Sequence, residues 1–488
     1  MTDSFAALQA RYGPRYRWLL LLSVMIGTMA SIMSSTVVNV AIPDMSRHFT
    51  LGQERAQWVT SGFMVASTVA MLLTPWLLGR FGYRRTYIGT MLLLLAGGML
   101  GGLADNFSLV LLARMAEGLA AGVVQPIPAI IIMRAFETTE QGRASSFYGA
   151  GVVLAPAIGP SVGGLLVDWF GWRSIFFMVM PFCLASIYMA VRFVPVTAPG
   201  GGAASKDGAS LDWRGLTIAS VGTLCLLNGL VELHSGITAV AGVLLGIAIA
   251  SLVTFVLWQR HLARTGREPL MNLALFGYRQ FAMGSIVAVI YGTALFGSTY
   301  LLPVFMQLGL QLSASHAGTI LLPAGLVLAI VIAGVGRLAD KQPTYLLVTI
   351  GLTLLSASFA VMVLVKLSTP IWVLVLFAIL GRAGLGFILP SLNIGSMRGL
   401  PKDMIASGSS AISFVRMLGG AAGVSLCGIL LEWRLTAHGD SLSTLTTSVA
   451  RLAAFDDVFW MLAGVCALAI VAAWQLREAP PRSSASNL

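Results

Sequence analysis

Charged residues are scarce in this chain. Only 10% of its 488 residues are Asp, Glu, Lys or Arg, whereas 57% are hydrophobic, and the mean hydropathy is +0.86. Soluble domains carry about 25% charged residues, so a soluble fold is excluded. The chain also lacks the GxxxxGK[ST] phosphate loop and the HExxH zinc motif. It therefore shows no sequence signal for ATP hydrolysis, for a metal site or for an enzyme.

Cysteine is rare too. The four cysteines all fall in apolar runs and none forms a CxxC pair, so we interpret them as small buried apolar side chains. The net charge of +11 could suggest a nucleic-acid partner. However, the positive residues lie in short loops between apolar runs, and this distribution rejects nucleic acid. No cofactor is expected.

Long apolar runs dominate what is present, and a helix that spans a membrane needs about 20 such residues. The first run, Trp18 to Ile42, is longer than the apolar core of a secretory signal, so we expect an uncleaved first span. Fourteen spans are predicted, at residues 18–42, 57–78, 86–104, 107–130, 144–167, 173–194, 214–233, 238–259, 280–307, 314–336, 344–365, 370–396, 404–432 and 455–476.

The positive charges orient these spans. Most of the 30 Lys and Arg residues lie near the two termini or in loops that follow even-numbered spans. By the positive-inside rule these segments face the cytoplasm. The sequence thus predicts an all-α, multi-pass membrane protein with both termini cytoplasmic, and the even number of spans is consistent with this.

An internal repeat is indicated by three pairs of segments in the same order. Spans 2 and 10 end in similar basic loops, spans 4 and 12 each carry one buried arginine, and spans 5 and 13 share small-residue runs. Internal repeats are typical of secondary transporters. We predict a six-helix bundle over 1–196, a linker with two inserted helices over 197–279, and a second six-helix bundle over 280–488.

The stretch Gly151 to Gly164, GVVLAPAIGPSVGG, lies within the fifth span. Pro156 and Pro160 should kink a membrane helix rather than end it, because its backbone has no water to bond instead. Gly151, Gly159, Gly163 and Gly164 allow another helix to approach closely. Two interpretations stay open: a packing face of small residues, or a kinked helix at a moving contact between two bundles.

One ion pair is expected inside the membrane. Arg114 and Glu117 lie three residues apart in the fourth span, so they share a helix face. A charge at the membrane centre costs about 2.5–3.5 kcal/mol on insertion scales, and such groups are usually functional. The alternative is a self-neutralised pair that only fixes packing.

The loop after the second span resembles the signature loop of the major facilitator superfamily, with glycine at position 79 where that family has Asp. In the family this loop latches the two halves together on the inside. The resemblance implies such a latch here, and the second-half copy of the motif retains its acid. The latch residues that it implies are Arg80, Gly82, Arg84, Arg85 and Asp340.

Two further motifs carry the resemblance. The segment around Arg114 resembles the family's RxxQG motif, with Glu117 in place of Gln. Gly151 to Gly164 closely matches the family's exporter motif, and the chain resembles the fourteen-helix drug/proton antiporter branch. That branch usually has an Asp in the first span, where Ser34 and Ser35 stand here. Glu117 is then the acid well inside a span, and we hypothesise that it carries the proton.

A substrate cavity is expected between the two bundles. Polar side chains in spans that would line it could bind a small molecule, although each could instead bond between helices. These candidates are Asn39, Gln125, Tyr291, Tyr300, Gln307 and Asn393.

The prediction is therefore a major facilitator fold in the plasma (inner) membrane, with two six-helix bundles and two inserted helices. Its function would be export of small lipophilic or cationic compounds by proton antiport with alternating access. A facilitator or symporter of a metabolite, or a transport-dead receptor or assembly protein, are the alternatives. The expected partners are a small-molecule substrate, protons and membrane lipid. Some relatives also join an adaptor protein in the outer compartment, and such an adaptor is considered as a further partner.

Overall fold

The computed structural model describes residues 4–50, 53–199, 210–233, 238–440 and 448–477, and these residues contain helices and no strands. Two short helices open the chain, and long ones follow. The helices are α1 (Phe5–Tyr12), η1 (Gly13–Arg15), α2 (Tyr16–His48), α3 (Gln53–Phe81), α4 (Tyr83–Gly102), α5 (Phe107–Val124), α6 (Ile127–Ala135), α7 (Gln141–Phe170), α8 (Ser174–Met178), α9 (Met180–Phe193), α10 (Trp213–Glu232), α11 (Ala239–Arg264), η3 (Leu273–Gly277), α12 (Arg279–Val304), η4 (Phe305–Gly309), α13 (Ala314–Ala339), α14 (Thr344–Met362), α15 (Ile371–Met397), α16 (Ile405–Ala437) and α17 (Val449–Trp474).

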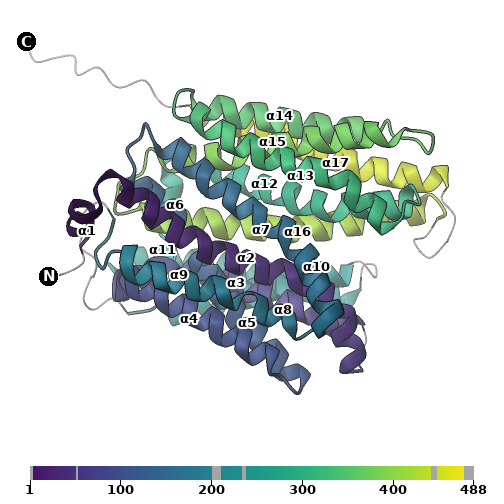
Figure 1. Cartoon of the computed structure of the whole chain (residues 1–488). Coiled ribbons are helices and arrows are strands. Elements are labelled where there is room, and N and C mark those ends of the chain that lie inside the picture. The colour runs from purple at the N-terminus through teal and green to yellow at the C-terminus, as the bar shows by residue number, and fades with distance from the viewer. Residues whose placement is uncertain (1–3, 51–52, 200–209, 234–237, 441–447, 478–488) are drawn as a thin grey trace, which may run out of the picture.

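Twelve helical segments of the described residues are long and apolar enough to cross a membrane. They include α2, α3, α12 and α17, and the segments in which α5 and α6 or α8 and α9 follow one another. Helices α4 and α7, with 20 and 30 residues, lie among them in the same bundle (Figure 1). Large apolar side chains such as Trp169, Phe170 and Ile330 are about 70% exposed, as expected for a surface that faces lipid rather than water.

Prolines divide two of the predicted spans. The span expected at 107–130 is two helices, α5 and α6, because Pro126 and Pro128 start a new helix after Gln125. The span expected at 173–194 is α8 and α9, with Pro181 in the first turn of α9. Proline is tolerated at the start of a helix, where its missing N–H has no partner to lose. Other ends differ from prediction by several residues, most of all at α2 and α17.

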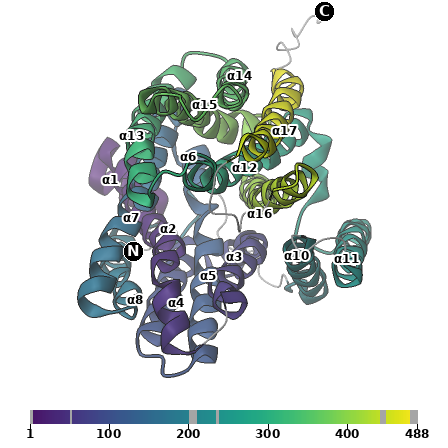
Figure 2. The ribbon, with the colours of Figure 1, turned by 90° about the vertical axis from the view of Figure 1, so that its right-hand side faces the viewer.

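The long helices pack in two sets that repeat the same arrangement. In the first set α2 packs on α7, and both α3 and α4 pack on α5; in the second α12 packs on α16, and both α13 and α14 pack on α15. Each pair occupies the same place in the chain order. This is the packing expected of two related units, and we call them the N half (α2–α9) and the C half (α12–α17). Helices α7 and α13, and α3 and α16, join the halves (Figure 2).

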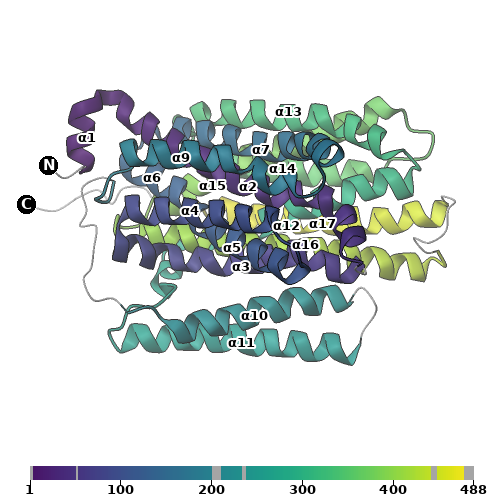
Figure 3. The same cartoon turned by 60° about the horizontal axis from the view of Figure 1, so that its bottom comes forward.

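Helices α10 and α11 form a hairpin beside the two halves (Figure 3). Asp212 caps α10 by accepting from Gly215 N at 2.8 Å, and it also accepts from Trp258 Nε1 at 2.9 Å and Gln259 Nε2 at 2.8 Å on α11. One carboxylate therefore fixes the two helices together. Of this pair, α10 contacts both α3 and α16, so it touches both halves.

Helix α1 and the end of α17 lie at the same end of the bundle (Figure 1). We call it the α1 end. The turns after α3, α6, α9, α13 and α15 lie at this end as well, since the successive long helices run in alternating directions. Together with the two terminal segments and the turn after α11, these turns carry most of the positive charges noted in the sequence.

Candidate functional site

A buried ion pair lies at the centre of the N half. Arg114 and Glu117 lie on one face of α5, and Arg114 Nη1 donates to Glu117 Oε2 at 2.6 Å. Each side chain is only 1% exposed. The structure places the pair in the protein interior rather than against lipid, and the three-residue spacing gives the contact that the sequence predicted.

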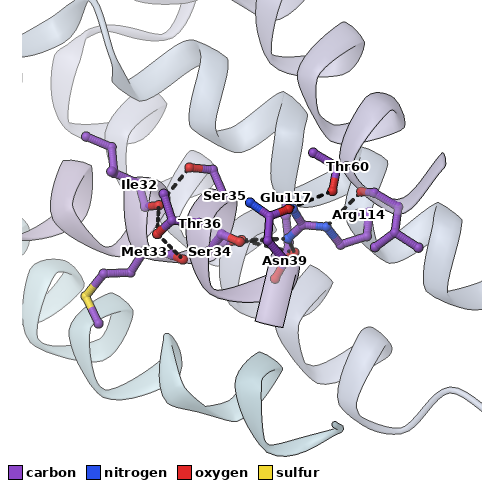
Figure 4. A network of polar contacts seen from close by, with 10 residues as sticks. Ile32, Met33, Ser34, Ser35, Thr36, Asn39, Thr60, Arg114 and Glu117 are labelled. Atoms are coloured by element: carbon purple, nitrogen blue, oxygen red, sulfur yellow. Dashed lines mark hydrogen bonds and ion pairs between the residues drawn. The ribbon is translucent and has the colours of Figure 1, made fainter. Parts of the chain in front are cut away.

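Ser34 on α2 completes this pair. Its hydroxyl donates to Glu117 Oε2 at 3.1 Å and accepts from Arg114 Nη1 at 2.9 Å. The Ser34 carbonyl also accepts from Arg114 Nη1 at 3.2 Å. Figure 4 shows these three side chains pointing toward one another from two helices. Ser34 stands near the position where the resemblance leads one to expect an acid, and here it binds the acid of another helix.

Helices α3 and α4 close the site. Arg114 Nε donates to the Val59 carbonyl at 3.2 Å, and the guanidinium lies 4.4 Å from the centre of the Phe63 ring. On α4, a Cβ added to Gly97 would approach the Glu117 side chain at 2.8 Å, so glycine is needed for α4 to pass so closely. The carboxylate is thus enclosed by α2, α4 and α5.

The Glu117 carboxylate is subject to opposing influences. Its burial favours the neutral form, whereas the guanidinium of Arg114 and the hydroxyl of Ser34 favour the charged form. Loss of the negative charge would leave the buried Arg114 without its counter-charge. Arg114 Nη2 has no hydrogen-bond partner among the described residues. Within the same residues no group of three His, Cys, Asp or Glu could hold a metal.

The glycines of the fifth span face α2. Added Cβ atoms on Gly159 and Gly163 would meet the side chain of Val37, and one on Gly151 would meet Met25. Helix α7 runs unbroken through this stretch, as predicted for prolines in a membrane helix, and Pro156 is exposed. The side chain of Pro160 lies outside the described part. These glycines therefore supply a packing face within the N half.

The contact between the halves lies nearer the start of α7. An added Cβ on Gly142 would collide with the Gly336 carbonyl of α13, and one on Gly336 would collide with Ser146 and with the Gly142 carbonyl. Two glycines thus let the backbones of α7 and α13 touch at the α1 end. A signal for this contact existed in the sequence, since Gly336 begins the basic motif GRLADK at the end of α13.

Asp340 reinforces that contact. Its carboxylate accepts from the backbone N–H of Gly142 at 2.6 Å and of Arg143 at 3.0 Å. It therefore ends α13 and caps the N-terminus of α7, where backbone N–H groups lack helical partners. Burial raises the pKa of Asp340, and the two N–H donors partly offset this rise.

The basic loop after α3 makes its contacts inside the N half. Arg84 Nε donates to the Val194 carbonyl at 2.6 Å. Gly82 has φ +76°, a left-handed conformation that favours glycine, and an added Cβ would lie 2.9 Å from the Val196 carbonyl. Arg80 and Arg85 are exposed. Five residues were predicted to form the latch. Among their described contacts, those of Asp340 reach the opposite half.

Two more hydrogen bonds cross between the halves at the α1 end. Arg134 Nη2 donates to the Lys402 carbonyl at 2.6 Å, and Ser409 Oγ donates to the Pro126 carbonyl at 2.8 Å. Sequence reasoning missed both, because each acceptor is a backbone carbonyl and carries no sequence signal. With Asp340, these contacts hold the halves together at this end.

The predicted cavity residues are dispersed. Asn39 accepts from Thr60 Oγ1 at 3.0 Å and is exposed, as Gln307 is. Asn393 lines a small hollow between the halves with Tyr148, and Tyr291 is 3% exposed. Gln125 and Tyr300 are half-buried.

Two acids lie further inside a helix than the predicted bounds of the last span, 455–476, imply. Asp456 and Asp457 lie two turns into α17, since this helix begins at Val449. Asp457 pairs with Arg434 of α16, and Asp440 pairs with the fully buried Arg451 at 3.1 Å. The Asp-Asp dipeptide was a signal that could have drawn attention to this cluster.

The helical architecture and the buried ion pair define a membrane transport protein. The family model for the Major Facilitator Superfamily matches residues 24–424, and the chain belongs to this family. It is 25% identical to the riboflavin transporter RibZ of Clostridioides difficile over 94% of this chain and 97% of that protein. It is 28% identical to a multidrug resistance protein B homolog of Mycobacterium tuberculosis over 85% of this chain and 77% of that one.

Solved structures agree on the fold. The human organic anion transporter MFSD10 superposes with a TM-score of 0.65 at 13% identity, covering 94% of this chain and 99% of that one. At this identity the likeness shows the fold alone. The chain is thus a multi-pass membrane transporter and not an enzyme, and it binds a small-molecule substrate as a member of this family.

Proposed function

We propose that this protein exports small organic compounds from the cell by proton antiport, with Glu117 as the proton site. The observation that carries the proposal is the buried triad of Glu117, Arg114 and Ser34, in which the carboxylate is 1% exposed. Export is favoured by the exporter-type stretch at Gly151 to Gly164 and by the multidrug resistance relative. The riboflavin transporter relative keeps a single metabolite as the alternative cargo.

The proposed topology has fourteen crossings, with α4 and α7 crossing in addition to the twelve segments that meet the length and hydropathy criteria. The α1 end is then cytoplasmic, in line with its positive charges. The bundle boundaries at 196 and 279, the plasma (inner) membrane and an adaptor protein in the outer compartment stay predictions.

Alternating access would follow from the contacts at the α1 end. Asp340, Gly142 and Gly336 hold α7 against α13 there. This conformation is then the one closed to the cytoplasm, and separation of these contacts would open it. The glycines of α7 pack closely against α2. This packing would let α7 move together with α2 as part of a rigid N half.

The energy source is a proton gradient. One proton entering across 100 mV contributes about 2.3 kcal/mol before any pH difference, and each 1.4 kcal/mol corresponds to about a tenfold concentration ratio. A single proton per cycle could therefore concentrate a neutral compound more than tenfold.

The test is transport by Glu117→Gln in proteoliposomes. An efflux panel with and without the protein first identifies a transported compound. The variant should lose accumulation driven by an imposed pH gradient, yet keep exchange of labelled for unlabelled substrate, which needs no net proton movement. Glu137→Gln, at an exposed residue of the α1 end, is the matched control. Undiminished gradient-driven transport by Glu117→Gln would rule the proposal out.

A further inference from the structure

Two arginines of the C half, Arg382 and Arg416, lie within membrane-spanning helices and have no carboxylate partner among the residues that the structure describes. Arg382 on α15 has one side-chain hydrogen bond in the described part of the chain, from Nη2 to Thr299 Oγ1 at 3.5 Å. Arg416 on α16 has none there. Both residues are half-buried, so neither is sealed inside the protein as Arg114 is.

Three other arginines of the spanning helices pair with an acid. These pairs are Arg114 with Glu117, Arg434 with Asp457, and Arg451 with Asp440. Arg382 differs from Arg114 in this respect. In the internal repeat, Arg382 has the place in α15 that Arg114 has in α5. Three residues after Arg114 stands Glu117, whereas three residues after Arg382 stands Leu385, which is buried. At this position of the repeat, the C half has the arginine but not the glutamate that follows it in the N half.

The surroundings of the two arginines are polar and aromatic. Tyr291 on α12 lies within electrostatic range of both guanidinium groups, and Tyr148 on α7 lies within range of Arg416. The backbones of α12 and α16 touch where Gly292 meets the Arg416 carbonyl. Arg416 is therefore near tyrosines from both halves, at the boundary where alternating access would expose it.

Arg382 lines a hollow of its own. Ser298 of α12 and Ser358 of α14 lie beside it in the wall of this hollow, together with apolar side chains of α12, α14 and α15. The hollow is small in this conformation, and Arg382 and the two serines are the polar groups of its wall.

Two uncompensated charges in a membrane are costly, and a counter-charge would lower that cost. Guanidinium groups bind carboxylates and sulfonates with paired hydrogen bonds, and tyrosine rings pack against aromatic compounds. We propose that Arg382 and Arg416 form the anion-binding part of the substrate site, and that the substrate class is an amphipathic organic anion carrying a carboxylate or sulfonate.

This assignment rests on the proposed export function and restricts its substrate to organic anions. The sequence favoured lipophilic or cationic compounds. A cation would have to leave against the membrane potential and past two guanidinium groups, whereas an anion leaves with the potential. A single proton site such as Glu117 is then sufficient for export.

The test uses three probes with one skeleton: 1-naphthaleneacetate, its neutral methyl ester and the cation 1-naphthylmethylammonium. Equilibrium binding to the purified full chain in detergent needs no gradient, so it separates this inference from the export mechanism. We expect saturable binding of the anion, at least tenfold tighter than of the cation. Equal binding, preference for the cation, or no saturable binding of the anion would each overturn the inference.

Variants locate the site. Arg382→Gln and Arg416→Gln should each weaken binding of the anion by about tenfold or more, while Arg382→Lys should retain part of it. Arg260→Gln, at an exposed residue of α11, removes the same charge and should leave binding unchanged. Equal loss in all three Gln variants would assign the effect to net charge and contradict the site.

Chemical modification gives a readout that does not depend on substitutions. Phenylglyoxal should modify Arg382 and Arg416 but spare Arg114, which is 1% exposed. The naphthaleneacetate anion should protect both arginines, as read by mass spectrometry, and the cation should not. Modification that the two probes block equally would count against an anion site.

Discussion

Ser34 Oγ and Glu117 Oε2 lie 3.1 Å apart, although 83 residues separate them in the chain. The same hydroxyl lies 2.9 Å from Arg114 Nη1. Ser34 therefore holds both members of the ion pair in one orientation from a different helix. In the resemblance to drug/proton antiporters this region of the first span carries an acid. Here it carries a neutral residue that supports an acid elsewhere.

Ser34→Ala should lower proton-driven transport by about two- to tenfold, because a net hydrogen bond contributes about 0.5–1.5 kcal/mol. Ser35→Ala is the matched control, since the Ser35 hydroxyl donates to the Ile32 carbonyl of its own helix at 2.7 Å. Transport against an imposed pH gradient measures both. Equal effects of the two variants would show that Ser34 has no special role in the triad.

Arg114→Gln should destabilise the protein by about 3–5 kcal/mol, because it leaves the buried carboxylate of Glu117 without its cation. The double variant Arg114→Gln/Glu117→Gln should recover most of that stability, since neither charge remains. The measurement is the thermal unfolding midpoint in detergent, followed by tryptophan fluorescence. A double variant as unstable as Arg114→Gln would mean that the ion pair is not the source of the loss.

Gly336→Val should block closure of the α1 end. An added side chain would collide with Ser146 and with the Gly142 carbonyl on α7, so we expect transport to fall at least tenfold. Gly334→Val is the control on the same helix, because an added Cβ there meets nothing within 4 Å. Spin labels at Thr138 and Lys341, both exposed at this end, should report a longer distance in Gly336→Val alone. An unchanged distance distribution would contradict the role given to this contact.

Acidification should favour the conformation closed at the α1 end. Burial raises the pKa of Asp340 in this conformation, whereas separation of the halves would return the carboxyl to its ordinary pKa. The closed conformation then binds the proton more tightly, so its population should rise as the pH falls through the raised pKa and decrease as the pH rises through it.

The same pair of spin labels measures this pH dependence, and Asp340→Ala should remove it. Asp403→Asn, at an exposed acid of the same end, should leave the pH dependence in place. A pH response that survives in Asp340→Ala would assign it to another group.

The sequence predicted long apolar helices because a membrane span needs about 20 apolar residues. Within the described residues, twelve segments meet the length and hydropathy criteria, and the two predicted spans at α4 and α7 do not. The i,i+3 spacing also predicted the Arg114–Glu117 contact. It did not predict that Ser34 would bind Glu117, because a contact between distant segments depends on how α2 and α5 pack. The breaks at Pro126 and before Pro181 were visible as prolines, but the sequence alone does not tell a kink from a new helix.

The site beyond the ion pair was harder to predict. The glycines from Gly151 to Gly164 were ambiguous between packing and motion, and they face α2 within one half. The contact that joins the halves lies about two and a half turns before Gly151, at Gly142. Arg382 was noticed as a buried charge, but only the structure shows that it lacks the acidic partner that Arg114 has.

The hairpin of α10 and α11 has a mechanical consequence. Because α10 contacts both α3 and α16, it fills one side of the seam between the halves, while α7 and α13 on another side meet directly. If the halves rock against each other, α3 and α16 must slide along α10 on this side of the molecule.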